Sequence, residues 1–512
     1  MYHDLDRAAT LTSAWIIFLL CCVSPVLWML VGTTGSGIAE AMAILWSARQ
    51  SELLLRTLSL GAGAALCAAA VGLPLGVVLG RCDPSRVRVA RFALVVPLIL
   101  PPYVLALAWT VLAERLLGSW TYSLPAAAAV LGFALFPIVM LGAEAAMRSM
   151  SARLEEAGRL VAPARQVWLK ILLPLMMAAI AASTLVVFVL SISDFSVPSM
   201  LRVRVYTTEV YTAFAALYEF RLATLLAAPL AVIASVASVL ALELVRRPSA
   251  GRVDRGQIGP RWPPSRQRLA ALLLMVAAAL VTFTPVGAVA IEARRGRVAF
   301  ADAASVDAIS NGLWWSLTSA TLVVVVGALL GYWRTKAGAA RAHLADVSWI
   351  ALFAIPATVA GIGIIGLWNR PGLLGELYRS GVVVVLAYVT RFLPIAALLC
   401  AAFLRRAPPG LEEAAIVSGA RWRRVFIRIV IPAARSGVVG VWLAMFILMS
   451  GDVALTILVA PPGESNLAVR AYTLMANSPV GDVARIALVQ IALSVLPLVA
   501  FALLVPRRLD TA

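Results

Sequence analysis

Residues able to carry out chemistry are few in this 512-residue chain, and they are widely spaced. The cysteines have neither a CxxC pattern nor the spacing of metal ligands, and the two histidines, His3 and His343, form no cluster. A phosphate-binding loop requires a lysine between glycine and serine or threonine, and neither Lys170 nor Lys336 has these neighbours. The sequence therefore predicts no metal site, no cofactor, no enzyme active site and no ATPase motif.

Acidic residues at matched positions are more informative. Glu155 and Glu413 are 258 residues apart, and so are Asp194 and Asp452. The same offset, without a gap, carries further residues of one copy onto the other: Ala157 onto Ala415, Ala162 onto Ala420, Ile171 onto Ile429 and Pro174 onto Pro432. Because the offset is about half of the chain, we expect a tandem duplication of one module.

The composition is that of a chain surrounded by lipid. Hydrophobic residues make up 62% of the sequence and charged residues 13%, and the mean hydropathy is +0.94. The net charge is +18, but the arginines lie between apolar runs and do not alternate with aromatic residues in one basic domain. We therefore expect membrane lipid, and no nucleic acid, as the surrounding partner.

The elements that must position the acidic residues are apolar runs of about 20 residues, the length that spans a bilayer. Six lie in each half, near 12–32, 56–80, 92–113, 123–147, 172–192 and 222–245, then near 268–291, 313–333, 347–368, 380–404, 433–459 and 484–505. The expected fold is an all-α polytopic membrane protein with about twelve transmembrane helices. Its halves are residues 1–246 and 268–512, joined by a basic cytosolic linker at 247–267.

Arginine placement predicts the orientation, because basic residues in short loops stay on the cytosolic side. The loops after the second and fourth runs are rich in them: Arg81, Arg86, Arg88, Arg91, Arg148, Arg153, Arg159 and Arg165. The opposite loops have fewer, although Arg202, Arg204, Arg294, Arg295 and Arg297 weaken the contrast. We expect both termini and both copies of the repeated segment on the cytosolic face.

The repeated segment combines a glutamate with small residues and ends on a proline. The small residues permit close approach of another backbone: Ala157, Gly158, Ala414, Ala415 and Gly419. Pro174 and Pro432 are expected in the first turn of the next membrane helix, where a missing N–H costs little. The pattern suits a short surface helix that docks on a partner. The alternative is an ordinary amphipathic loop helix, which two copies make less favourable.

This pattern resembles the EAA loop of the permease subunits of binding-protein-dependent ABC importers. The second copy matches in Glu413, Ala414, Ala415, Gly419, Ile429, Ile431 and Pro432. The first copy keeps Glu155, Ala157 and Pro174 but has Glu156 at the first alanine position and Val161 at the glycine position. The resemblance implies that each loop is a coupling helix inserted into an ATPase subunit, so that two ATPase copies serve one chain.

Further stretches are similar to the ferric-iron permease family. They are residues 100–108 and 355–363, Arg391–Pro394, and residues 193–198 before 206–211. The resemblance implies a multi-pass bacterial inner-membrane permease that receives ferric iron from an extracytoplasmic binding protein. Thiamine, a phosphonate or a polyamine are alternative substrates of the same machinery. An ion-gradient-driven secondary transporter is the alternative from another class.

Asp194 and Asp452 are the local candidates for a substrate path. Asp194 follows Pro174 by 20 residues, which corresponds to about 30 Å of helix, so each aspartate is expected at the outer end of its helix. One interpretation makes the pair an acidic rim of the outer vestibule, and the favoured one makes each a cap for the following turn. Arg391, in an apolar run, is expected to fix helix packing.

Overall fold

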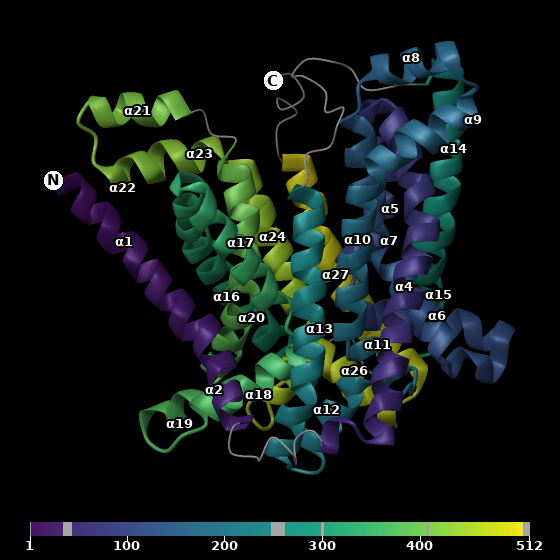
Figure 1. Ribbon diagram of the computed structural model, residues 1–512. Coiled ribbons are helices and arrows are strands. Elements are labelled where there is room, and N and C mark those ends of the chain that lie inside the picture. The colour runs from purple at the N-terminus through teal and green to yellow at the C-terminus, as the bar shows by residue number, and fades with distance from the viewer. Residues whose placement is uncertain (1, 34–42, 247–261, 298–301, 406–408, 505–512) are drawn as a thin grey trace.

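The computed structural model describes residues 2–33, 43–246, 262–297, 302–405 and 409–504. In these ranges the chain is a bundle of helices with no strand (Figure 1). Most of the expected linker, residues 247–261, lies outside the described part. Its last residues, 264–267, already belong to the first helix of the second half.

The helices of the first half follow one another with short connections. They are α1 Tyr2–Phe18, η1 Leu19–Val23, α2 Ser24–Thr33, α4 Ala48–Arg81, α5 Pro84–Ile99, α6 Pro102–Leu117, η2 Gly118–Tyr122, α7 Leu124–Arg148, α8 Ala152–Val161, α9 Ala164–Val167, η3 Trp168–Leu172, α10 Leu173–Ser193, α11 Ser196–Met200, α12 Tyr206–Ala215 and α13 Phe220–Arg246.

The second half repeats this order. Its helices are α14 Pro264–Ala278, η4 Ala279–Phe283, α15 Thr284–Ala293, α16 Ala303–Lys336, α17 Ala339–Ala354, α18 Ala357–Trp368, α19 Leu373–Tyr378, α20 Val382–Leu404, α21 Pro409–Val417, α22 Trp422–Val425, η5 Phe426–Val430, α23 Ile431–Ala433, α24 Arg435–Ser450, α25 Thr456–Val459, α26 Leu467–Asn477 and α27 Val480–Leu504. The longest helices, α4 and α16, each have 34 residues, as expected for two copies of one module.

Four π-helical turns stand at repeated places, and proline explains them. The turns η1, η3, η4 and η5 each end two residues before a proline, respectively Pro25, Pro174, Pro285 and Pro432. Proline lacks an N–H and its ring clashes with the carbonyl four residues earlier. A widened turn removes that clash without breaking the helix.

The third apolar run of each half is not one straight helix, contrary to the expectation at 92–113 and 347–368. Helices α5 and α6 meet at a bend of 100°, and α17 and α18 at a bend of 93°. The sequence at the first bend is Leu100-Pro101-Pro102 and at the second Ile355-Pro356. A residue before proline is driven out of the helical region, and proline itself offers no hydrogen-bond donor, so both helices break there.

The eleventh expected span, 433–459, also differs. A bend of 80° separates α23 from α24, which ends at Ser450, and a separate short helix, α25, begins at Thr456. In the described part of the chain nine helices are long and apolar enough to span a membrane, or up to twelve if each bent pair counts as one span. This agrees with the expected all-α membrane fold.

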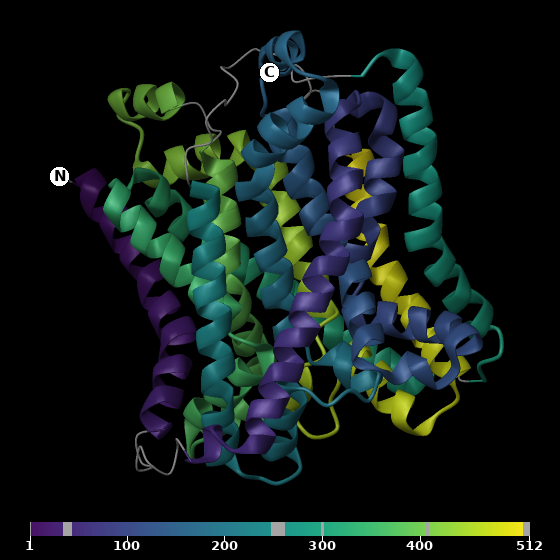
Figure 2. The same cartoon turned by 45° about the vertical axis from the view of Figure 1, so that its right-hand side comes forward.

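The two halves exchange their first helices. Helix α1 packs against α16 and α22 of the second half, and α14 packs against α5 of the first half. Figure 1 shows α1 at one edge of the bundle and α14 at the other, each beside helices of the other half. In Figure 2 the two helices again lie at opposite edges. The two halves are therefore not independently packed bodies.

Glycines form the tightest helix contacts, at equivalent places in the two halves. On α4, a Cβ added to Gly72 would lie 2.6 Å from the carbonyl oxygen of Phe136 in α7. On α16, a Cβ added to Gly331 would lie 2.7 Å from the main-chain nitrogen of Ala401 in α20. Gly76 and Gly327 complete the two Gly-x-x-x-Gly seams. Such seams let backbones approach closely, so α4 packs tightly on α7, and α16 on α20.

Candidate coupling helices and central cavity

Helices α8 and α21 lie across the same end of the bundle (Figure 1). Each follows a long membrane helix and leads through a short helix, α9 or α22, into the next membrane helix. Residues 164–172 and 422–430 have matching elements, a four-residue α-helix and a five-residue π-turn. Here the offset of 258 residues holds, and both repeated segments share one face as expected.

Glu155 anchors α8 to the rest of the first half. It is the fourth residue of α8 and only 6% exposed. One carboxylate oxygen, Oε1, lies 3.2 Å from Nη1 of Arg81, the last residue of α4. The same oxygen lies 2.6 Å from Nη2 of Arg159, one turn further along α8. A buried carboxylate with these partners is part of the fold and not of the free surface.

Glu412 makes the equivalent contact in the second half. It is the fourth residue of α21 and 9% exposed. Its Oε2 lies 2.7 Å from Nζ of Lys336, the last residue of α16, and its Oε1 accepts a hydrogen bond from the hydroxyl of Tyr332. Glu412 therefore corresponds to Glu155, although the pattern of the sequence did not single it out.

This correspondence corrects the ungapped alignment within the two coupling helices. Glu413 is exposed and matches Glu156, which is also exposed. Within the two helices the offset is 257 residues. It returns to 258 after them, because the second copy has one extra residue where α21 ends. There Gly419 has a φ of +80°, and the N–H of Ala420 donates to the carbonyl of Ala415 at 3.0 Å. This is the Schellman closure that favours glycine.

The small residues of the motif have different roles. A Cβ added to Gly158 would lie 3.1 Å from side-chain atoms of Val167 and Ile171, so this glycine does permit close packing, of α8 on the next helix. Gly419 has open space around its Cα and was expected to permit the same, but its role is the turn. Ala157 and Ala414 are exposed on the outer side of their helices, and Ala415 is partly buried.

Pro174 is the second residue of α10 and Pro432 the second residue of α23, so each lies in the first turn of its helix, as expected. The segment Ala164–Ser193 is one continuous span, so Pro174 lies ten residues inside it, after the π-turn η3. Pro432 likewise follows η5, shortly before the bend at Ala434. The π-turn before each proline accommodates its missing N–H, so helical structure continues from the preceding short helix.

Asp194 and Asp452 lie at the ends of α10 and α24 that are remote from the coupling helices, and both cap the next helix. The main-chain N–H of Val197 donates to Asp194 Oδ1 at 2.8 Å, and that of Leu455 to Asp452 Oδ1 at 2.8 Å. Ser196 and Thr456 add donors to the same carboxylates. This geometry is that of the cap favoured from the sequence.

Arg391 stands between these two caps. It is close enough to interact electrostatically with both Asp194 and Asp452. Its Nη1 donates at 3.3 Å to the carbonyl oxygen of Ile355, at the bend between α17 and α18. Its buried Nε has no hydrogen-bond partner in the protein. Arg391 thus contacts the bend and lies within electrostatic range of a carboxylate in each half, which suits the packing role expected for it.

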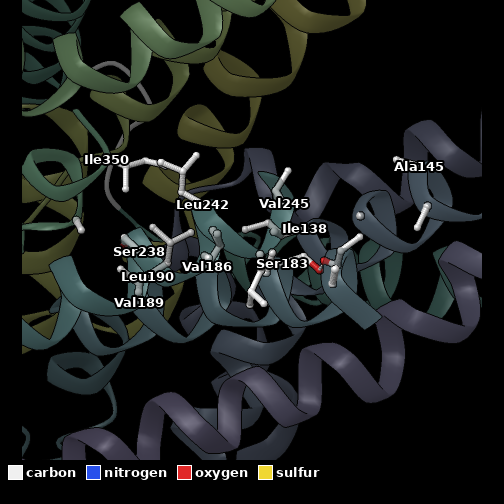
Figure 3. A pocket seen from close by; sticks show the side chains of 18 of the residues that line it. Ile138, Ala145, Ser183, Val186, Val189, Leu190, Ser238, Leu242, Val245 and Ile350 are labelled. Carbon is white, nitrogen blue, oxygen red and sulfur yellow. Dashed lines mark hydrogen bonds between the residues drawn. The ribbon is translucent and has the colours of Figure 1, made fainter. Parts of the chain in front are cut away.

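A cavity of about 640 Å³ lies between the halves. It is lined by α7, α10 and α13 of the first half and by α17 and α20 of the second. Figure 3 shows Ser183, Val186 and Leu190 of α10, with Ser238 and Leu242 of α13 and Ile350 of α17, around it. Arg391 is the one charged residue among those that line this cavity.

The cavity walls do not form a metal site. Within the described ranges, no group of three or more His, Cys, Asp or Glu residues is placed to hold a metal ion. Serine hydroxyls supply the other polar groups, and the rest of the lining is apolar. The cavity therefore resembles a passage between two halves more than a tight binding site.

Residues 72–249 and 323–511 each match the family model described as "Binding-protein-dependent transport system inner membrane component". The chain belongs to this family. It is thus the multi-pass inner-membrane permease of a binding-protein-dependent ABC importer, and it works with an ATPase and a substrate-binding protein. The two matches cover well over half of the chain, one in each repeat.

Similar proteins include permeases of several named systems. The Fe(3+)-transport system permease protein FbpB 2 of Haemophilus influenzae is 21% identical over 94% of this chain and 97% of its own length. The putative ferric transport system permease protein FbpB 1 of the same organism is 22% identical over 80% of this chain and 70% of its own length. The trehalose transport system permease protein SugB of Mycobacterium tuberculosis is 26% identical over 40% of this chain and 73% of its own length.

Several residues of the permease site were missed by sequence reasoning. Glu412 and its partners Tyr332 and Lys336 are far apart in sequence and meet only because α16 ends beneath α21. A signal was present, since Arg81 and Lys336 both end a 34-residue helix. Aligning the two long helices as well as the two loops would have found the pair.

Proposed function

We propose that this permease imports ferric iron handed over by an extracytoplasmic binding protein, driven by two copies of an ATPase. The proposal of ferric iron as the substrate rests on the full-length similarity to the ferric-iron permease of Haemophilus influenzae, which spans 94% of this chain and 97% of the relative. The trehalose permease relative covers 40% of the chain, the extent of a single half. Family membership favours ATP-driven import over the ion-gradient-driven alternative.

The coupling helices α8 and α21 are proposed to dock the two ATPase copies. Their exposed motif residues, Glu156, Ala157, Glu413 and Ala414, are available to a partner on the free side of the helices. The remaining residues of the expected coupling set, Glu155, Gly158, Ala415, Gly419, Pro174 and Pro432, hold or shape the segment. We further propose that the docking face is cytosolic and that both termini lie on that side.

The cavity between the halves is proposed to be part of the substrate path. Its position between α10 of one half and α20 of the other suits a passage that opens and closes as the halves turn against each other. Asp194 and Asp452 mark where the outer vestibule begins, beyond the Arg391 end of the cavity. With no cluster of metal ligands among the described residues, the ion is transferred and not retained.

The test is uptake of radiolabelled ferric ion by iron-starved cells whose other ferric importers are deleted. Cells with the intact chain, a deletion, a Glu413→Ala rescue and a Glu52→Ala rescue are compared. Glu52 is an exposed glutamate near the other end of α4, with a side chain 63% exposed, and serves as the matched control. We expect uptake to be lost in the deletion, reduced with Glu413→Ala and retained with Glu52→Ala.

The same cells are then offered thiamine, a phosphonate and a polyamine. Iron uptake that is unaffected by the deletion, together with loss of uptake for one of these compounds, would assign that compound as the substrate instead. Loss of ferric uptake alone supports iron. Uptake that responds to collapse of the ion gradient but not to loss of ATP would contradict the ATP-driven mechanism itself.

A further inference from the structure

The buried glutamates of the coupling helices occupy equivalent positions, and their contacts lead to the cavity. Glu155 and Glu412 are each the fourth residue of their helix, and each pairs with the last residue of a 34-residue membrane helix. The neighbouring Glu156 and Glu413 point away and are exposed. The motif therefore contains two acidic positions in opposite environments. One is buried against the helix bundle, and the other is exposed on the surface proposed to meet the ATPase.

We propose that Glu155 and Glu412 are positioning residues that transmit movement of the coupling helices to the cavity walls, while the adjacent exposed glutamates face the ATPase. The proposal rests on the proposed docking function of α8 and α21. It assigns the transmission to two ion pairs, Glu155 with Arg81 and Glu412 with Lys336, at 3.2 Å and 2.7 Å.

Movement at each ion pair is first transmitted along a rigid helix. Arg81 ends α4 and Lys336 ends α16, so a displacement of either residue is a displacement of the helix end. The second step crosses the glycine seams. Because Gly72 leaves no room for a Cβ against α7, and Gly331 none against α20, the paired helices cannot slide or separate without opening a gap.

The third step reaches the cavity. Helix α7 contributes Ile138 and Gly142 to its wall, and α20 contributes Arg391 and Ile395. Besides its chain connections to the neighbouring membrane helices, each coupling helix is thus connected to one side of the cavity through one ion pair and one glycine seam.

Residues on or near the exchanged first helices approach both ion pairs. The Arg81 guanidinium lies 5.8 Å from the ring centre of Trp168 and 5.9 Å from that of Trp262, the residue just before α14. At the second pair, Arg7 of α1 lies 5.6 Å from the ring centre of Tyr332. Cation–π contacts of this kind are attractive and favour these side-chain positions.

The two ion pairs act as tethers, one holding α8 to α4 and the other holding α21 to α16, and they are not identical. Both oxygens of Glu412 are engaged, one by Lys336 and one by Tyr332. In the first half, Oε2 of Glu155 is buried without a partner, since Val77 stands where the second half has Tyr332. A buried polar atom left unsatisfied weakens a contact, so we expect the α8 tether to release more readily than the α21 tether.

The decisive experiment is hydrogen exchange on the purified permease without ATPase or substrate. The variants are Glu155→Gln and Glu412→Gln, with Glu156→Gln and Glu413→Gln as matched neighbours on the same helices. We expect the main-chain amides of residues 152–161 to exchange at least tenfold faster in Glu155→Gln, and those of 409–417 in Glu412→Gln. The neighbour variants should leave exchange unchanged. Equal exchange in all four variants would overturn the tether.

A second measurement separates the tether from docking. The same variants are assembled with the ATPase, and the complex yield and the stimulation of ATP hydrolysis by the loaded binding protein are recorded. Tether variants should keep the complex but lose most of the stimulation, whereas the neighbour variants should lose the complex. The reverse pattern would contradict the assignment of the two positions.

Charge reversal provides the final check. The single variant Arg81→Glu should lose stimulation, and the double variant Arg81→Glu with Glu155→Arg should recover part of it. Absence of any recovery, with both proteins folded by their exchange pattern, would argue against transmission through this pair. If the intact chain bound no ATPase, while the exchange result held, the proposed function would fail and the tether would stand.

Discussion

The main-chain N–H of Trp262 donates to the carbonyl oxygen of Arg81 at 3.1 Å, which fastens the start of the second half to the end of α4 in the first half. Gln267 strengthens this joint by accepting a hydrogen bond from the N–H of Asp83 at 3.2 Å. Further along the exchanged helix, the hydroxyl of Thr282 donates to the carbonyl of Ala93 at 3.0 Å. The halves are therefore held by their first helices as well as by the linker.

Cutting the chain in the linker should not separate the halves. We expect residues 1–250 and 251–512, expressed together as two chains, to co-purify and to support transport, because each first helix is packed on the other half. The measurement is affinity purification through a tag on one fragment. As a control, the first fragment is made without residues 1–33, which removes one exchanged helix. Equal recovery with and without this helix would show that the exchange contributes little.

Filling a glycine seam should destabilise the permease. In Gly331→Ala the new methyl group would lie 2.7 Å from the main-chain nitrogen of Ala401, so α16 and α20 must separate. Overpacking of this kind costs about 1–3 kcal/mol. Gly440→Ala is the control, since nothing lies within 4 Å of its added Cβ, and it should be neutral or stabilising by up to about 1 kcal/mol. Thermal unfolding in detergent, followed by tryptophan fluorescence, compares the two.

Replacing Asp452 should distinguish its capping role from its charge. Asp452→Ala removes the acceptor for the N–H groups of Leu455 and Thr456, which costs about 0.5–2 kcal/mol. Asp452→Asn keeps a capping oxygen but removes the charge that faces Arg391. We expect Asn to retain most of the stability lost in Ala, measured by thermal unfolding. If Asn and Ala are equally destabilised, the charge beside Arg391 matters more than the cap.

The cavity should change its accessibility during the transport cycle. Ser238→Cys on α13 and Ile350→Cys on α17 each place a thiol in the cavity lining, one from each half, in a chain whose five native cysteines are replaced by alanine. We expect a membrane-permeant maleimide to label both positions without nucleotide, and labelling to fall at least fivefold when ATP and vanadate hold the complex closed. Cys at position 236, where Val236 is exposed on the outer side of α13, is the control and should be labelled equally in both states.

Several features of this permease followed directly from its sequence. Long apolar runs indicated a membrane bundle because a helix of about 20 apolar residues satisfies its own backbone hydrogen bonds in lipid. The repeat of Glu155, Asp194 and their surroundings at a fixed offset indicated two equivalent halves, and the elements confirm this. The spacing from Pro174 placed Asp194 at the end of its helix, where it caps the next turn. These are local properties, set by residues close together in the chain.

Tertiary structure alone decided the rest. Which glutamate of the second coupling helix is buried depends on where α16 ends, and that placed Glu412, not Glu413, beside Lys336. The exchange of α1 and α14 depends on contacts between segments far apart in the chain. The position of Arg391 between the two aspartates requires both halves to be assembled. The sequence shows which surface of each helix is apolar. An apolar surface can lie against lipid or against another helix, so packing and buried polar pairs decide which helices become neighbours.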